Sequence, residues 1–155
     1  MNLYKSYGIS LPFVAAGMLF LLIRLISVNS LIEVNFFETY YIVSKSMLTT
    51  GLVVAMFCFA LVYQIFFRID HPLNTKLGMA HFLVTLLGAL ILASLPAVDM
   101  LPGDYQKMRQ NMDRLSLFCL IGSGIFCFGQ LILALNIART FFYSINPAGK
   151  ELPRR

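Results

Sequence analysis

Few side chains in this chain suit the binding of a metal or a haem iron. Lys45 and Met47 lie two residues apart near the start of an apolar run, and each carries an atom that can ligate haem iron. His81 lies inside the next apolar run. A ligand site needs further convergent groups, and the first three apolar runs contain no obvious second ligand. A lone histidine of this kind is typical of a structural hydrogen bond, so we predict no metal or cofactor bound by this chain alone.

The positions of the three cysteines indicate a packing role and not a disulfide or a metal site. Cys58, Cys119 and Cys127 all fall inside apolar runs and have no CxxC or CxxH spacing, so a disulfide framework, a zinc site or a c-type haem is not indicated. The chain has no nucleophile–base pair, no paired carboxylates and no phosphate-binding loop. We therefore predict no catalytic residue, and a stand-alone enzyme is the least favoured function.

The composition indicates a membrane protein. The 155 residues are 59% hydrophobic and 12% charged, whereas soluble domains carry about 25% charged residues. Only Lys5 precedes the first apolar run as a basic residue, and no small-residue cleavage site follows it. We interpret that run as a retained membrane span instead of a cleaved signal peptide.

Four apolar runs are long enough to cross the hydrocarbon core, which takes about 20 helical residues. We predict a single all-α transmembrane domain over residues 1–155, with four transmembrane helices at about 9–28, 40–67, 77–95 and 115–142. Pro72 should stop the second helix, and Asn74 or Thr75 should cap the third. Residues 105–114 are predicted to form a short interfacial helix before the fourth span.

Basic residues are distributed unevenly between the two ends of these spans. One side carries Lys5, Arg68, Lys76, Arg139, Lys150, Arg154 and Arg155. The other side carries Lys107, Arg109 and Arg114 together with Glu33, Glu38, Asp99, Asp104 and Asp113. The positive-inside rule predicts that both termini are cytoplasmic, in a bacterial inner membrane. Because the charge is segregated in this way, a nucleic-acid partner is not indicated.

The fourth span has a face of small and polar residues. Gly122, Gly124 and Gly129 allow another helix to approach closely, and Gln130 and Asn136 are predicted to hydrogen-bond across helices. We expect these five residues to form a packing interface.

Three segments resemble the catalytic subunit (subunit I) of haem-copper oxidases. The segment at 38–47, which reads E-T-Y-Y-I-V-S-K-S-M, looks like the family's D-T-Y-Y-V-V-A-H-F-H. Residues 77–88 are similar to L-G-x-x-H-F-W-L-T-F-I-G, and residues 121–137 are similar to I-G-S-x-I-S-x-x-S-Q-L-L-F-L-Y-N-I. Their order and spacing correspond to helices nine to twelve of that subunit, so the resemblance covers nearly the whole chain.

The resemblance implies that the haem ligands are lost. Lys45 and Met47 occupy the positions of the two haem-ligating histidines, whereas His81 corresponds to a family histidine that ligates neither haem nor copper. We expect the Lys45 ammonium to snorkel towards headgroups or to pair with Glu33 or Glu38, which leaves no lone pair for iron.

The expected function is therefore that of a non-catalytic membrane subunit of a respiratory haem-copper terminal oxidase (cytochrome c oxidase-like), part of an oxidoreductase complex. Its partners would be the larger subunits, which carry haem and copper, and membrane lipids. The alternative is an oxidase assembly protein or a membrane protein that binds haem or quinone. A weaker third reading, a split catalytic subunit, conflicts with the ligand loss.

Overall fold

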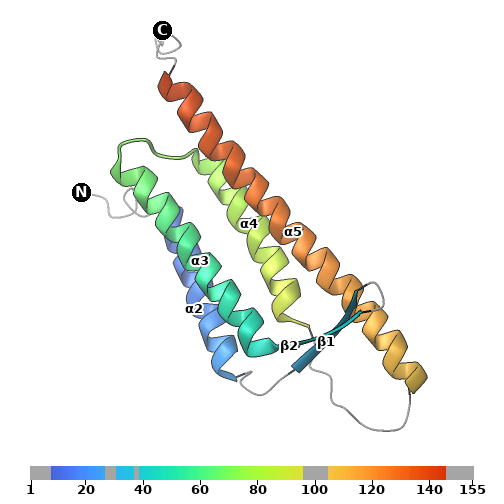
Figure 1. The fold of residues 1–155 in the computed structure, drawn as a ribbon. Helices are drawn as coiled ribbons and strands as arrows, with labels where there is room; N and C mark the ends of the chain where they lie inside the picture. The colour runs from blue at the N-terminus through green and yellow to red at the C-terminus, as the bar shows by residue number, and fades with distance from the viewer. Residues whose placement is uncertain (1–7, 27–30, 37–38, 96–104, 146–155) are drawn as a thin grey trace.

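The described part of the protein is a bundle of four helices with a short β-hairpin at one end (Figure 1). The computed structural model describes residues 8–26, 31–36, 39–95 and 105–145. The elements run in the order α2 (Ser10–Ile26), β1 (Leu31–Phe36), β2 (Thr39–Ser44), α3 (Lys45–Arg68), α4 (Thr75–Ala93) and α5 (Tyr105–Ile145).

The four predicted helices are present, and three of them have the length and composition to cross a membrane. These three are α3, α4 and residues Asp113–Phe142 of α5. Helix α2 is equally apolar but has 17 residues, which at 1.5 Å per residue spans about 26 Å. The described part of the chain is therefore mostly helical, with apolar helices that suit a membrane.

The segment before α3 is an antiparallel hairpin, which corrects the prediction of a helix from residue 40 onwards. Leu31 pairs with Ser44 and Phe36 with Thr39. Residues 39–43 are threonine, tyrosine and β-branched residues, which prefer strands because their side chains pack well on a pleated surface. Ile32 is fully buried, whereas Ile42 is exposed. The apolar run at 40–67 is thus shared between a strand and a helix.

The turn between α3 and α4 follows local capping rules. The N–H of His71 donates to the carbonyl of Phe66, and Asp70 adopts a positive φ of 56°, as in a Schellman motif. The Asn74 side chain accepts hydrogen bonds from the backbone N–H groups of Lys76 and Leu77, at 3.0 and 3.2 Å. The predicted cap of the third helix is confirmed at Asn74.

Helix α5 is continuous from Tyr105 to Ile145, which corrects the prediction of a separate interfacial helix at 105–114. Its 41 residues correspond to about 60 Å, about twice the thickness of the hydrocarbon core. No glycine or proline interrupts residues 105–114, so the helix has no local signal to stop before the apolar run.

The helices pack mainly as two pairs, α2 with α3 and α4 with α5, and a cluster of rings joins the pairs. Phe13 on α2 is fully buried at its centre. Its ring centroid lies 5.7 Å from Phe59, 5.6 Å from Tyr63, 5.0 Å from His81 and 5.0 Å from Phe82. The cluster of rings around Phe13 is therefore built from three helices, α2, α3 and α4.

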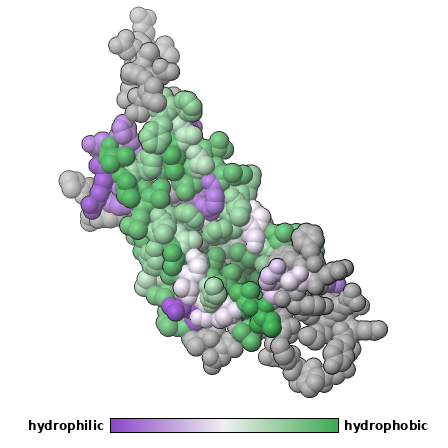
Figure 2. Space-filling view, in the orientation of Figure 1, coloured by the Kyte–Doolittle hydropathy of each residue, from purple (hydrophilic) through white to green (hydrophobic). Residues whose placement is uncertain are grey.

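Large apolar side chains also cover the outer surface of the helices. Exposed examples are Leu22, Leu61, Leu83 and Leu131, one on each helix. The face in Figure 2 is largely hydrophobic along the helices, and hydrophilic residues gather near the α3–α4 turn. Such a surface suits lipid or apolar protein partners better than water.

Candidate functional site

The Lys45 side chain contacts the far end of α4. Lys45 is the first residue of α3, and its Nζ donates a hydrogen bond to the backbone carbonyl of Leu95 at 3.0 Å. Helix α4 ends at Ala93, so the ammonium lies beside the negative end of the α4 dipole, which favours a cation. The bond joins α3 to α4 across 50 residues of sequence.

This contact differs from the expected partners of Lys45. Glu38 and the side chain of Glu33 lie outside the described part of the chain, so pairing with either stays a prediction. The hydrogen bond that is described goes to a backbone carbonyl, which is a polar acceptor without a formal charge, so it is not an ion pair.

Met47 does not converge with Lys45. Its side chain is 74% exposed, whereas Lys45 is half-buried. Two residues of an α-helix are separated by about 200° around its axis, so the two side chains point to opposite sides. Lys45 and Met47 therefore do not form a common ligand site among the described residues.

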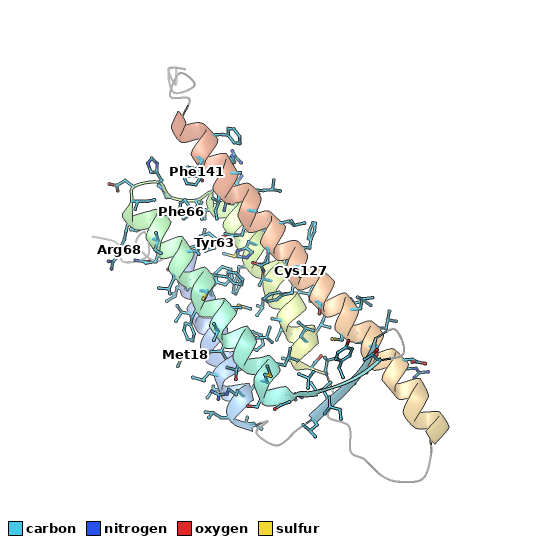
Figure 3. The ribbon with its side chains drawn as sticks, viewed as in Figure 1. Met18, Tyr63, Phe66, Arg68, Cys127 and Phe141 are labelled. Atoms are coloured by element: carbon cyan, nitrogen blue, oxygen red, sulfur yellow. The ribbon has the colours of Figure 1, made fainter. Side chains whose placement is uncertain are left out.

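His81 is fully buried and hydrogen-bonded to Tyr63 of α3. The Tyr63 hydroxyl lies 3.0 Å from His81 Nδ1. The imidazole is also in contact with the rings of Phe13 and Phe59, with centroids 5.0 and 5.1 Å away. Tyr63 lies on the side of α3 that faces α4 and α5 (Figure 3). The structural hydrogen bond predicted for His81 is thus confirmed, and Tyr63 is a partner that the sequence did not reveal.

Asn136 links α5 to the α3–α4 turn. Its side-chain oxygen accepts from the backbone N–H of Asn74 at 2.9 Å, and its side-chain nitrogen donates to the Asn74 carbonyl at 3.1 Å. Asn136 is fully buried, so both of its polar atoms are satisfied by one residue's backbone. Asn136 was predicted to hydrogen-bond across helices, and its described hydrogen bonds join α5 to the turn before α4.

Gln130 has a more local contact. Its amide nitrogen donates to the carbonyl of Phe126, one turn earlier in the same helix, at 3.0 Å. The Gln130 side chain also lies beside His81 of α4. Gln130 was predicted to hydrogen-bond across helices, and the hydrogen bond with described geometry lies within its own helix.

Helices α4 and α5 approach each other through glycines. A Cβ atom added at Gly88 would lie 2.5 Å from the backbone nitrogen of Phe126 and 2.9 Å from the carbonyl oxygen of Gly122. A Cβ added at Gly129 would collide with the hydroxyl of Thr85. Gly122 and Gly129 thus pack against α4 as predicted.

Gly124 departs from this pattern. It is exposed, and a Cβ added there would have nothing within 4 Å among the described residues. The spacing explains this, because Gly122 and Gly129 are seven residues apart on one face, whereas Gly124 is rotated by about 200° from Gly122. The intrachain packing expected of Gly124 is therefore absent, and its role as a contact for another chain stays a prediction.

The packing face of α4 was missed from the sequence, although a signal was present. Its small and polar buried residues recur at intervals of three and four: Gly78, His81, Thr85 and Gly88. This period places them on one side of a helix. The spacing of these four residues predicts the α4 face that contacts α3 and α5, whereas His81 taken alone does not.

Other groups with potential chemistry are dispersed. Cys58 and Cys127 are exposed and Cys119 is half-buried, and all three are free thiols. Within residues 8–26, 31–36, 39–95 and 105–145, no three His, Cys, Asp or Glu side chains are placed to share a metal ion.

The fold and these contacts define a class, a small helical bundle whose apolar helices suit a membrane. No protein-family model, no curated protein and no solved structure matches the chain.

Proposed function

We propose that this chain is a non-catalytic integral membrane subunit of a haem-copper terminal oxidase complex, in which it packs against larger redox subunits. One observation carries the proposal. The glycines and polar residues that it shares with the family's helices eleven and twelve lie at contacts between its own elements. They are Gly78, His81, Thr85, Gly88, Gly122, Gln130 and Asn136.

Lys45 and Met47, at the replaced ligand positions, do not lie at a shared contact between helices. Met47 faces outwards and Lys45 contacts a backbone carbonyl. The resemblance is therefore retained where helices contact each other and lost where haem would bind. This combination favours a packing element over a redox centre, with haem and copper held by the partner subunits.

The outer surface supports the need for partners. Most of the membrane-length part of α5 is not covered by the rest of the chain. Gly124, Cys127 and Phe128 lie on its exposed surface. A helix with an apolar side and a small residue on it suits close approach by another membrane helix.

The proposal includes insertion of the four helices in a bacterial cytoplasmic membrane with both termini on the cytoplasmic side. The uneven distribution of Lys and Arg supports this orientation. Single cysteines introduced at Asp104 and Lys150, in a chain whose three native cysteines are replaced by serine, would report it. A membrane-impermeant maleimide should label position 104 from outside intact cells, and labelling of position 150 would contradict the orientation.

Purification of the tagged full chain in a mild detergent tests the partner. We expect stoichiometric amounts of larger oxidase subunits and the absorption bands of their haems in the same fraction. Gly124→Leu should reduce the recovery of those subunits without unfolding the chain, because a side chain there has open space within the chain itself. Gly51→Leu, at a similarly open glycine of α3, is the matched control.

Two results distinguish the alternatives. Association with incomplete oxidase that lacks haem would indicate an assembly protein. Recovery of the chain alone, together with unchanged oxidase composition and activity in its absence, would contradict both functions.

A further inference from the structure

Two fully buried side chains of α4 each keep a polar atom that has no hydrogen-bond partner among the described residues. These atoms are Nε2 of His81 and Oγ1 of Thr85. The residues are four apart, so their side chains are neighbours on one face, with about 5–6 Å between Cβ atoms. Unpaired buried polar atoms are rare and costly, and two that are adjacent point to a shared partner.

The His81 ring has little freedom to find a partner by rotating. Its Nδ1 already contacts the Tyr63 hydroxyl at 3.0 Å, and Phe13 and Phe59 lie against the ring. A flip of the imidazole would exchange one unpaired nitrogen for the other. Rotation of the ring therefore cannot satisfy both nitrogens, and Nε2 needs a further hydrogen-bonding group beside it.

The surroundings of Thr85 and His81 are polar and uncharged. Thr85 Oγ1 lies against Gly129 and occupies the space that a side chain there would need. Gln130 is the hydrogen-bonding neighbour of His81 on α5, but no direct bond of acceptable geometry reaches Nε2. The Gln130 amide nitrogen donates to the Phe126 carbonyl, which leaves the amide oxygen as an acceptor. No negative charge is present among these groups, so a neutral ligand suits them better than a cation.

We propose that a water molecule is bound between α4 and α5, where it bridges His81 Nε2 and Thr85 Oγ1 with Gln130 as a third neighbour. Water both donates and accepts, so it satisfies a hydroxyl and either tautomer of the imidazole. Two hydrogen bonds of about 2.8 Å cover the separation of an i, i+4 pair. Buried waters typically make about three such bonds to groups that are otherwise unpaired.

The water has a structural role in this position. One turn beyond Thr85, Gly88 packs against the backbone of Phe126, so the polar face of α4 ends there. The bridged groups therefore hold α4 against α5. The row of polar side chains does not extend from them towards the hairpin end of the bundle. This site is independent of any oxidase partner.

Thermal unfolding of the full chain in mild detergent tests the site. Thr85→Val removes the hydroxyl and keeps the shape, so loss of the bridge should lower Tm by about 2–4 °C. Thr85→Ser keeps the hydroxyl and measures the loss of the methyl group alone. If the hydroxyl has no partner in the protein, Thr85→Val will leave Tm unchanged or raise it, and the proposal is wrong.

A double-mutant cycle with His81→Phe tests whether the two residues share the water. The effect of Thr85→Val should fall by at least half in the His81→Phe background, and additive effects would overturn the bridge. The chain has two histidines, and His71 is exposed in the turn, so His71→Gln leaves His81 as the only imidazole. In that variant, water-edited NMR should transfer magnetisation from a bound water to the His81 ring, and Thr85→Val should abolish the transfer. Absence of the transfer before that substitution would mean that Gln130 pairs with the ring directly and would refute the site.

Discussion

The two helix pairs of the bundle are held together in different ways. Between α4 and α5, Gly88 faces the backbone of Phe126 and Gly122, so main chain packs on main chain. Between α2 and α3, Gly17 faces the ring of Phe57, and the contact is made by side chains. The first interface depends on the absence of side chains, whereas the second depends on their volume.

This difference has a consequence for tolerance to mutation. A backbone cannot move away from an added methyl group without separating the helices, but a ring at the end of a flexible side chain can. We therefore expect the largest effects of small substitutions at the α4–α5 interface.

The largest effect is expected for Gly88→Ala. The new Cβ would lie 2.5 Å from the Phe126 nitrogen, and separation of α4 from α5 should cost about 3 kcal/mol. Gly124→Ala is the matched control, because its Cβ would meet open space, and it should be neutral or up to about 1 kcal/mol stabilising through helix propensity. Thermal unfolding in detergent, followed by circular dichroism, measures both. Equal effects would refute the distinction between the α4–α5 contact at Gly88 and the outward surface of α5 at Gly124.

The next largest effect is expected for Asn136→Leu. It removes both hydrogen bonds to Asn74 and leaves the N–H of Asn74 unpaired, which should cost about 2 kcal/mol. The Asn74 carbonyl keeps the hydrogen bond that it accepts from the Gly78 N–H. Thr50→Val is a control, because the Thr50 hydroxyl bonds only to the Ser46 carbonyl of its own helix. The same unfolding measurement applies, and a control that loses as much stability as Asn136→Leu would show that the link to the turn is unimportant.

A smaller effect is expected for Lys45→Met. The loss of one charge-assisted hydrogen bond to Leu95 should cost about 1 kcal/mol, because the lysine is half-buried and partly solvated. Lys76→Met, at an exposed lysine, should cost less. The absorption spectrum of any parent complex should be the same in both variants. Loss of a haem band in Lys45→Met alone would make Lys45 a ligand and refute the packing role.

The smallest effect is expected for Gly17→Ala. Its Cβ would lie 3.2 Å from the Phe57 ring, which can shift by a few tenths of an ångström, so the cost should stay below about 1 kcal/mol. The comparison with Gly88→Ala uses the same substitution in the other helix pair. A cost at Gly17 that equals or exceeds the cost at Gly88 would remove the contrast between the two interfaces.

The local features of this protein could be read from its sequence. Hydropathy predicted the existence and order of the four helices, because a helix satisfies its own backbone and its apolar residues follow a local period. It misplaced the starts of α3 and α5, which begin at Lys45 and Tyr105 and not at about 40 and 115. The cap at Asn74 follows from a short side chain that accepts from N–H groups two and three residues ahead. The packing of Gly122 and Gly129 follows from their separation by seven residues on one helix face.

Other features were decided by tertiary structure alone. The strand at 39–44 competes with a helix over an apolar sequence that suits both, and pairing with Leu31–Phe36 is what selects the strand. Lys45 has acidic residues near it in the sequence, but its described partner is a carbonyl 50 residues away. Tyr63 joins His81, and Gly88 joins Phe126, across different helices. Each of these contacts depends on how the helices are arranged in space, and periodicity within one segment carries no information about which residue of another segment lies opposite.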